Sequence, residues 1–170
     1  MRYITLLLCS TFAAFILYVG HAAANIRIPV TPQVQLEDLT PHARAEVECL
    51  AQNMYFEAGK EPKLGQLAVA FVTHNRVQSG MFADTYCGVV KQKAEGVCQF
   101  SWYCDSSAKS RPINNSAYRE SMEVAKKVLL EGFRLPSLEK AMYFHGAHID
   151  PNWKYPRAAR IGNHIFYNDR

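Results

Sequence analysis

Two carboxylates lie close together in the stretch NMYFEAGKEP, and residues of this type at this spacing could carry out proton transfer. Glu57 falls at the end of an expected helix, where the helix dipole disfavours an acidic side chain. At about 100° per residue it lies at the edge of the apolar stripe, so its carboxyl is expected to be partly desolvated. Partial desolvation raises a carboxyl pKa, which suits a general acid working near neutral pH. The plain alternative is a solvated residue in the last helical turn.

Glu61 carries a weaker signal than Glu57. If the helix continued, the two carboxylates would share one face, but Pro62 disfavours helix at the residue before it. We therefore expect Glu61 to support the site, by orienting a cleft or adjusting the pKa of Glu57.

Two amphipathic helices must position this pair. The first is expected to begin at Pro41, with Thr40 as its cap, because apolar residues then recur at helical spacing as far as Ala58. Gly59 is expected to end it. A second, largely buried helix is expected over 64–78, so the two carboxylates lie around the break between two packed helices.

The rest of the chain adds one more long helix and a small β element. The third helix is expected to begin near Ser116 and to end at Gly132. Residues 85–104 are expected to be irregular or extended. Residues 141–145 (AMYFH) and 164–168 (HIFYN) alternate polar and aromatic side chains and are expected to be strands. The predicted fold class is α+β, mainly helical, with a small late β element.

The first 24 residues have the pattern of an export signal. Arg2 precedes an apolar run, and small residues at Ala22 and Ala24 fit a cleavage site after Ala24. The run is short for a membrane span of about 20 residues, so a releasable membrane anchor is the weaker interpretation. Residues 25–40 are rich in proline and polar side chains and are expected to form a linker. The folded domain is assigned to residues 41–170.

The composition fits a folded, exported domain. The chain has 170 residues, of which 49% are hydrophobic and 20% charged, as in globular proteins. Its net charge of +4 is too mild to predict nucleic-acid binding, but it is compatible with an anionic polymer outside the cell. We expect a monomer in the periplasm or outside the cell, without a stable membrane partner once the signal is removed.

Four cysteines remain if Cys9 leaves with the signal: Cys49, Cys87, Cys98 and Cys104. An even number in an exported chain favours two disulfides, for which the sequence permits three pairings. A Cys98–Cys104 bridge would close a tight local loop and leave Cys49 to pair with Cys87. A catalytic cysteine with a histidine partner is a weaker alternative, because it would leave an odd number of thiols in an oxidising compartment.

Five segments together resemble one known family. They are YFEAGKEPKLGQLAVAFVTHNRV, FADTYCGVVKQ, CQFSW, AMYFH and IGNHIFY, in this order. From about Cys49 to Tyr167 the chain is similar to the SleB/CwlJ cell wall hydrolases, the family of spore-cortex-lytic enzymes, and CQFSWYCD resembles its exported Gram-negative and phage branch. Two positions depart from the family pattern: Gly59-Lys60 replaces the usual Arg-Gly, and His74 replaces an apolar residue.

The resemblance implies a lysozyme-like catalytic domain that acts on peptidoglycan without a metal or other cofactor. The family's catalytic acid directly precedes Ala in its E-A-x-x-E motif, which corresponds to Glu57 here. Members of the family act as lytic transglycosylases, which cleave between N-acetylmuramic acid and N-acetylglucosamine and leave a 1,6-anhydro product. The expected partner is therefore a peptidoglycan glycan strand.

Further residues are expected to bind substrate in a groove around Glu57. They are Gln99, Phe100, Ser101, Trp102, Tyr143, His145, Asn163 and His164. Amides and hydroxyls can bind sugar hydroxyls, and an indole can stack on a sugar ring. Phe100 and Trp102 could equally be core residues beside a disulfide, and lone histidines more often make structural hydrogen bonds.

Two other functions remain open from the sequence. A zinc-dependent amidase could use His74, His145, His148 and His164 as ligands and Glu57 as base, although the H-G-A-H spacing differs from the helix-borne H-E-x-x-H arrangement. A noncatalytic wall-binding module would need only the aromatic residues, and would leave Glu57 unexplained.

Overall fold

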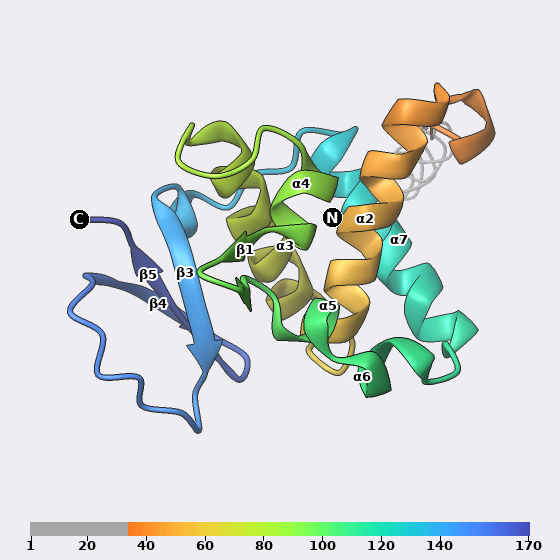
Figure 1. Ribbon diagram of the computed structural model, residues 1–170. Helices are drawn as coiled ribbons and strands as arrows, with labels where there is room; N and C mark the ends of the chain where they lie inside the picture. Colours follow the sequence, from red (N-terminus) through yellow and green to blue (C-terminus); the bar gives the residue numbers. More distant parts are fainter. Residues whose placement is uncertain (1–33) are drawn as a thin grey trace, which may run out of the picture. The chain divides into compact units, whose positions relative to one another are not determined.

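The computed structural model describes residues 34–170. The expected signal (1–24) and most of the expected linker lie outside the described residues. The described part consists of helices and two small antiparallel sheets, with the larger sheet on one side of the helices (Figure 1). The prediction of a mainly helical α+β fold is confirmed. No helix among these residues combines the length and apolarity that crossing a membrane requires.

Three long helices form the body of the domain. They are α2 (Pro41–Ala58), α3 (Lys63–Gln78) and α7 (Asn115–Leu129). Thr40 caps α2 as expected, and Asn114 caps α7 through its side-chain oxygen. Both ends of α2 and the C-terminal end of α3 fall where the sequence places them, so the break between these helices is where it was expected.

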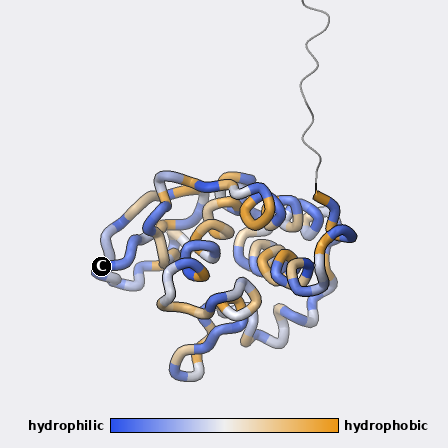
Figure 2. Tube along the Cα trace, turned by 90° about the horizontal axis from the view of Figure 1, so that it is seen from above, coloured by the Kyte–Doolittle hydropathy of each residue, from blue (hydrophilic) through white to orange (hydrophobic). Residues whose placement is uncertain are grey.

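The apolar faces of the three helices meet in one core. Figure 2 shows hydrophobic residues gathered where the helices face one another, with hydrophilic residues along the outer loops. The largest fully buried side chains of this core include Leu50, Met54, Val69, Val124 and Phe166. Each such side chain contributes roughly 1.5–3 kcal/mol of stability, so the core fixes α2 firmly against α3 and α7.

Gly59 ends α2 for a different reason from the one expected. Its φ of −63° is right-handed, whereas a glycine that stops a helix usually adopts the left-handed conformation. A Cβ atom at Gly59 would collide with the carbonyl oxygen of Tyr55. The connection between α2 and α3 therefore needs glycine for close backbone approach.

The late β element is a three-stranded antiparallel sheet in the order β3–β5–β4. The strands β3 (Ala141–Gly146) and β5 (His164–Asn168) confirm the prediction from alternation. The strand β4 (Arg157–Ile161) was not expected, because its sequence RAARI lacks the aromatic alternation of the other two. Phe144 pairs with Phe166 across β3 and β5, and both pack on the helical core.

Residues 85–104 were expected to be irregular or extended, and this prediction is wrong for the two helices that the segment contains. They contain α4 (Tyr86–Lys91), the hairpin of β1 (Lys93–Ala94) and β2 (Val97–Cys98), and α5 (Ser101–Cys104). A further short helix, α6 (Ser106–Ser110), follows. Elements of this length are too short to display a hydrophobic period, which is why the pattern did not reveal them.

Two disulfides tie these short elements to the rest of the domain. Cys49–Cys87 joins α2 to α4 with a Cα–Cα distance of 5.1 Å, and Cys98–Cys104 joins β2 to α5 with a Cα–Cα distance of 5.9 Å. This is the pairing expected from the sequence if Cys98 and Cys104 close a tight local loop and Cys49 pairs with Cys87. Because these four cysteines are bridged, none of them is available as a nucleophile.

The described end of the expected linker packs against the domain. A 3-10 helix, η2 (Leu36–Asp38), precedes α2, and Leu36 and Leu39 pack on the core. The Arg44 Nε donates to the Leu36 carbonyl at 3.1 Å. The folded unit therefore includes residues ahead of the expected boundary at residue 41.

Candidate active site

Glu57 lies in the last turn of α2 and borders a cavity of about 550 Å³. The cavity is formed by the end of α2, the α2–α3 connection and the segment before α7. Its lining includes Tyr55, Phe56, Lys60, Glu61, Arg111 and Asn114. The Tyr55 hydroxyl accepts a hydrogen bond from the Asn114 backbone N–H at 2.9 Å, which holds the segment before α7 against α2.

Burial changes the proton affinity of Glu57. The side chain is half-buried, and desolvation raises its pKa from 4.5 to about 7, against the opposing positive charge of Arg76. Among residues 34–170, none of the hydrogen bonds or ion pairs found involves the Glu57 carboxyl. A carboxyl with this pKa can both release and accept a proton near neutral pH.

Arg76 is a charged residue of this region that the sequence pattern did not single out. It is 5% exposed on α3, and its guanidinium carbon lies 5.0 Å from the ring centre of Phe82 and 5.1 Å from that of Phe100. The Tyr143 ring centre is 6.0 Å away. Its Nε donates to the Met142 carbonyl at 2.8 Å, which connects α3 to β3. The feature of the sequence that could have pointed to Arg76 is the presence of a charged residue within the helix expected to be buried, 64–78.

Arg76 stays protonated and keeps one donor without a partner. Burial lowers its pKa to about 10, with Tyr143 and Glu57 acting in the opposite direction. Its buried Nη1 has no hydrogen-bond partner in the part of the chain that the structure describes. A fixed positive charge near Glu57 favours the ionised form of its carboxyl.

Glu61 is held by the turn between β4 and β5. Its carboxylate accepts the Asn163 backbone N–H at 2.9 Å and the Asn163 Nδ2 at 3.0 Å. At Gly162, which has a φ of 58°, a Cβ atom would collide with Glu61 Oε2. Both carboxylate oxygens of Glu61 are therefore close to this turn. The contact joins the α2–α3 connection to the sheet.

Phe100 and Trp102 lie beneath the site and do not line the cavity. Phe100 is 2% exposed and Trp102 is 8% exposed. The Trp102 Nε1 donates to the Asn53 Oδ1 at 2.9 Å, and its ring stacks on Phe56 with ring centres 4.4 Å apart. The structure thus gives both residues the core environment that the sequence left as an alternative, and Trp102 supports the helical turn that carries Glu57.

The other residues expected in the groove also lie outside the Glu57 cavity. Asn163 is bound to Glu61, and Tyr143 donates to Asp169 Oδ1 at 3.2 Å. The His145 Nε2 lies 2.9 Å from the Tyr167 hydroxyl. The remaining positions are exposed Ser101, half-buried Gln99 and buried His164. A substrate role for these residues stays a prediction.

The four histidines of the zinc alternative are not gathered into a ligand set. Within residues 34–170 no group of three or more His, Cys, Asp or Glu side chains is arranged to hold a metal ion. His74, on α3, has its Nδ1 2.6 Å from the Tyr86 hydroxyl. Burial lowers the pKa of His74 to about 4, so this unusual histidine is a neutral hydrogen-bonded residue between α3 and α4.

Residues 60–167 match the family model of the cell wall hydrolases. The chain belongs to this family. The matched stretch includes Glu61 and begins just after Glu57, so the match itself does not cover the candidate acid.

Curated cell wall hydrolases named spore cortex-lytic enzyme are similar to this chain. The enzyme of Halalkalibacterium halodurans is 30% identical over 127 residues, which are 72% of this chain and 34% of that protein. The enzyme of Bacillus subtilis is 30% identical over 125 residues, which are 71% of this chain and 37% of that protein. One from Bacillus cereus is 29% identical over 129 residues, 74% of this chain and 45% of that protein. The chain thus spans about a third to just under half of these relatives.

Two solved structures of this family have a similar fold. One is the catalytic domain of the Bacillus cereus SleB protein, with a TM-score of 0.56 and 25% identity over 81% of this chain and 100% of that one. The other is the catalytic domain of the germination-specific lytic transglycosylase SleB from Bacillus anthracis, with a TM-score of 0.56 and 27% identity over 77% and 98% of the two chains. The expected resemblance is confirmed.

The cavity of this cell wall hydrolase is lined by one carboxyl of raised pKa together with aromatic and cationic side chains. Glu57 supplies an ionisable carboxyl at one wall, and Tyr55 and Phe56 supply aromatic rings beside it. Lys60 and Arg111 add positive charge. Because the second carboxylate, Glu61, is already bound by Asn163, the arrangement favours chemistry that needs a single acid.

Proposed function

We propose that this cell wall hydrolase cleaves the glycan strand of peptidoglycan between N-acetylmuramic acid and N-acetylglucosamine, as a lytic transglycosylase. The observation that carries the proposal is the half-buried Glu57 carboxyl beside the cavity, whose pKa burial raises to about 7. Family membership and the names of the similar proteins supply the substrate class.

In the proposed reaction Glu57 acts first as an acid and then as a base. The protonated carboxyl gives its proton to the glycosidic oxygen, and the bond from that oxygen to the anomeric carbon of muramic acid breaks. The sugar's own N-acetyl carbonyl stabilises the anomeric carbon. The Glu57 carboxylate then takes the proton of the 6-hydroxyl as that oxygen bonds to the anomeric carbon, which closes the 1,6-anhydro ring and restores the acid.

One carboxyl suffices for this sequence of steps. Ordinary glycosidases use a second carboxylate as nucleophile or base, but an internal hydroxyl that attacks the same sugar replaces that requirement. Between the two steps Glu57 is negatively charged in a desolvated position. The Arg76 charge supports the proposal, because it stabilises Glu57 in this intermediate state.

We also propose that the protein acts outside the cytoplasm on the cell wall, as a monomer with peptidoglycan as its partner. The two disulfides support an oxidising compartment, in the periplasm or outside the cell. Residues 1–24 are proposed to direct export.

Mass spectrometry of the products tests the proposed reaction. Purified sacculi digested by the protein should release muropeptides with 1,6-anhydro ends, with or without EDTA in the buffer. Reducing muramic ends would mean that water attacks instead. Freed stem peptides, with release blocked by EDTA, would replace the proposal with a zinc amidase.

A further inference from the structure

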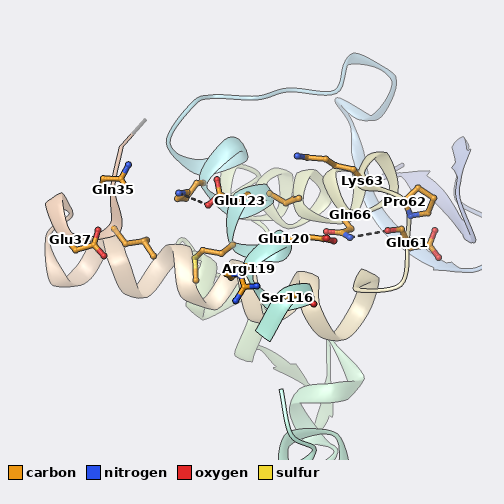
Figure 3. Close-up of a pocket in the computed structure, with 14 residues that line it drawn as sticks. Gln35, Glu37, Glu61, Pro62, Lys63, Gln66, Ser116, Arg119, Glu120 and Glu123 are labelled. Carbon is orange, nitrogen blue, oxygen red and sulfur yellow. Dashed lines mark hydrogen bonds and ion pairs between the residues drawn. The ribbon is translucent and has the colours of Figure 1, made fainter. Parts of the chain in front are cut away.

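A second cavity, of about 920 Å³, shares Glu61 with the Glu57 cavity. It is lined by η2, the first turn of α3 and one face of α7 (Figure 3). We call it the α7 groove. Figure 3 shows Glu37 at one end of it, Pro62, Lys63 and Gln66 at the other, and Arg119 and Glu120 between them. Neither Glu57 nor Arg76 lines this groove, so the proposed cleavage leaves it unexplained.

Gln66 gives the α7 groove a buried hydrogen-bond acceptor. The residue is 4% exposed, and its Nε2 donates to the Glu61 carbonyl at 3.1 Å. A carbonyl oxygen only accepts, so this bond fixes the orientation of the side-chain amide. The Gln66 Oε1 then has no partner within the described part of the chain. An unpaired buried amide oxygen is unfavourable, so the geometry favours a ligand that brings an N–H or O–H donor.

The charges around the groove favour a ligand with both signs of charge. The Glu61 carboxylate already lies at the start of α3, next to Gly65, so the groups that favour a ligand carboxylate are the cations Lys63 and Arg119. Lys63 lines the same end. Glu37 at the opposite end and Glu120 between them favour an ammonium group.

The lining also distinguishes a peptide from a sugar. The apolar residues of the groove are Leu36, Pro62, Met122 and Val124, and no aromatic ring is present among the residues that line it. Sugar-binding sites commonly offer aromatic faces, as Tyr55 and Phe56 do in the Glu57 cavity. The groove thus has an aliphatic lining, charged side chains of both signs and an amide acceptor. These features suit a short peptide with free carboxylates and an amine.

We propose that the α7 groove binds the stem peptide attached to the muramic acid of peptidoglycan. The inference rests on the proposed function, because the stem peptide belongs to the substrate only if the protein acts on peptidoglycan. A stem peptide offers amide N–H donors for Gln66 Oε1, carboxylates for Lys63 and Arg119, and the ammonium of its diamino acid for Glu37 and Glu120. Glu61 borders both cavities, so the peptide lies next to the sugar that Glu57 acts on.

Titration of the isolated peptide tests binding without any need for catalysis. The probe is the tetrapeptide L-Ala–γ-D-Glu–meso-diaminopimelate–D-Ala, added to the ¹⁵N-labelled protein. The side-chain amide resonances of Gln66 and the backbone resonance of Lys63 should shift and saturate, whereas the side chain of Gln52, which lines neither cavity, serves as a control that should not shift. No response at Gln66, or the same response to chitotetraose, overturns the proposal.

A pair of charge reversals tests the groove during catalysis. The readout is the ratio between solubilisation of intact sacculi and of glycan strands stripped of stem peptides by an amidase. The double variant Lys63→Glu/Arg119→Glu should lower this ratio about fivefold, from the loss of exposed charge interactions. The matched control Lys91→Glu/Lys140→Glu reverses two exposed lysines outside both cavities, changes the net charge equally, and should keep the wild-type ratio.

The two proposals fail in different ways in this experiment. Wild-type protein that releases glycan fragments from neither substrate contradicts the proposed function, and the titration then still decides whether the groove binds peptide. Wild-type protein that acts on both substrates, with the same ratio in the double variant, contradicts only the inference about the groove.

Discussion

The Glu57 carboxyl on α2 and the Arg76 guanidinium on α3 interact electrostatically without forming an ion pair. Burial raises the pKa of Glu57 to about 7, and Arg76 acts in the opposite direction. The shift is therefore a balance between desolvation, which favours the acid, and a nearby cation, which favours the carboxylate. In the proposed reaction this balance allows Glu57 to serve as acid and then as base. Substitution of either residue is expected to change the Glu57 pKa.

Replacement of Arg76 should move the alkaline limb of the pH–rate profile. A general acid is active while protonated, so activity is expected to fall as pH rises through the Glu57 pKa of about 7. Arg76→Met removes the charge that lowers this pKa, and the limb should move to higher pH. Arg76→Lys keeps the charge and should leave the limb near its wild-type position. Rates of sacculus solubilisation from pH 5 to 9 measure both. A uniform loss of rate at every pH in both variants would mean that Arg76 is only structural.

Glu57 should also make the folded protein less stable as pH rises. Its pKa in the folded state is raised to about 7, so the folded state binds the proton more tightly than the unfolded chain does. Stability is then lost between about pH 4.5 and 7, by an upper limit of roughly 3 kcal/mol. Glu57→Gln should melt at a higher temperature than the wild type at pH 8, and the difference should vanish near pH 4. Equal differences at both pH values would contradict a raised pKa.

Glu61 and Asn163 should behave as a coupled pair in stability. Glu61→Gln and Asn163→Ala each remove part of the contact between the α2–α3 connection and the β4–β5 turn, at a cost of about 1–2 kcal/mol. The double variant should cost less than the two single variants added together. Chemical denaturation of the four proteins measures the coupling. Strictly additive losses of stability in the double variant would argue against the contact. The rate of sacculus solubilisation should fall less in Glu61→Gln than in Glu57→Gln.

The two disulfides should differ in their effect on stability. Cys49–Cys87 spans 38 residues and Cys98–Cys104 spans 6. A bridge across a longer loop restricts the unfolded chain more, within the usual range of about 2–5 kcal/mol for small exported domains. Cys49→Ala/Cys87→Ala should therefore lower the melting temperature more than Cys98→Ala/Cys104→Ala. Peptide mapping without reduction checks the pairing first, and free thiols at these positions would contradict it.

What the sequence predicts well is the part of the fold with a long hydrophobic period. The helices α2 and α3 follow from apolar spacing, capping and the Pro62 break, and β3 and β5 follow from aromatic alternation. The short helices α4 and α5 could not be predicted in this way, because four to six residues are too few to show a helical period. The strand β4 could not be predicted because its sequence RAARI lacks the aromatic alternation of β3 and β5.

In the candidate site, too, features of a single helix could be predicted, whereas contacts between residues far apart in the sequence could not. Glu57 is recognisable from its place at the end of one helix. The electrostatic interaction of Glu57 with Arg76 is not recognisable from the sequence. It depends on how α3 packs against α2 and on the hydrogen bond that the Arg76 guanidinium donates to the Met142 carbonyl. The contact between Glu61 and Asn163 joins residues 102 positions apart, which no local pattern encodes.

The central claim, that Glu57 supplies the proton, is tested most directly by the rate at which Glu57→Gln protein solubilises sacculi. The variant keeps the shape of the side chain but lacks the proton, so the rate should fall by about 10²–10⁴-fold. Its melting temperature at pH 5, together with its retention on sacculi, shows whether it is folded and still binds. A folded Glu57→Gln protein that digests sacculi at the wild-type rate would contradict the account.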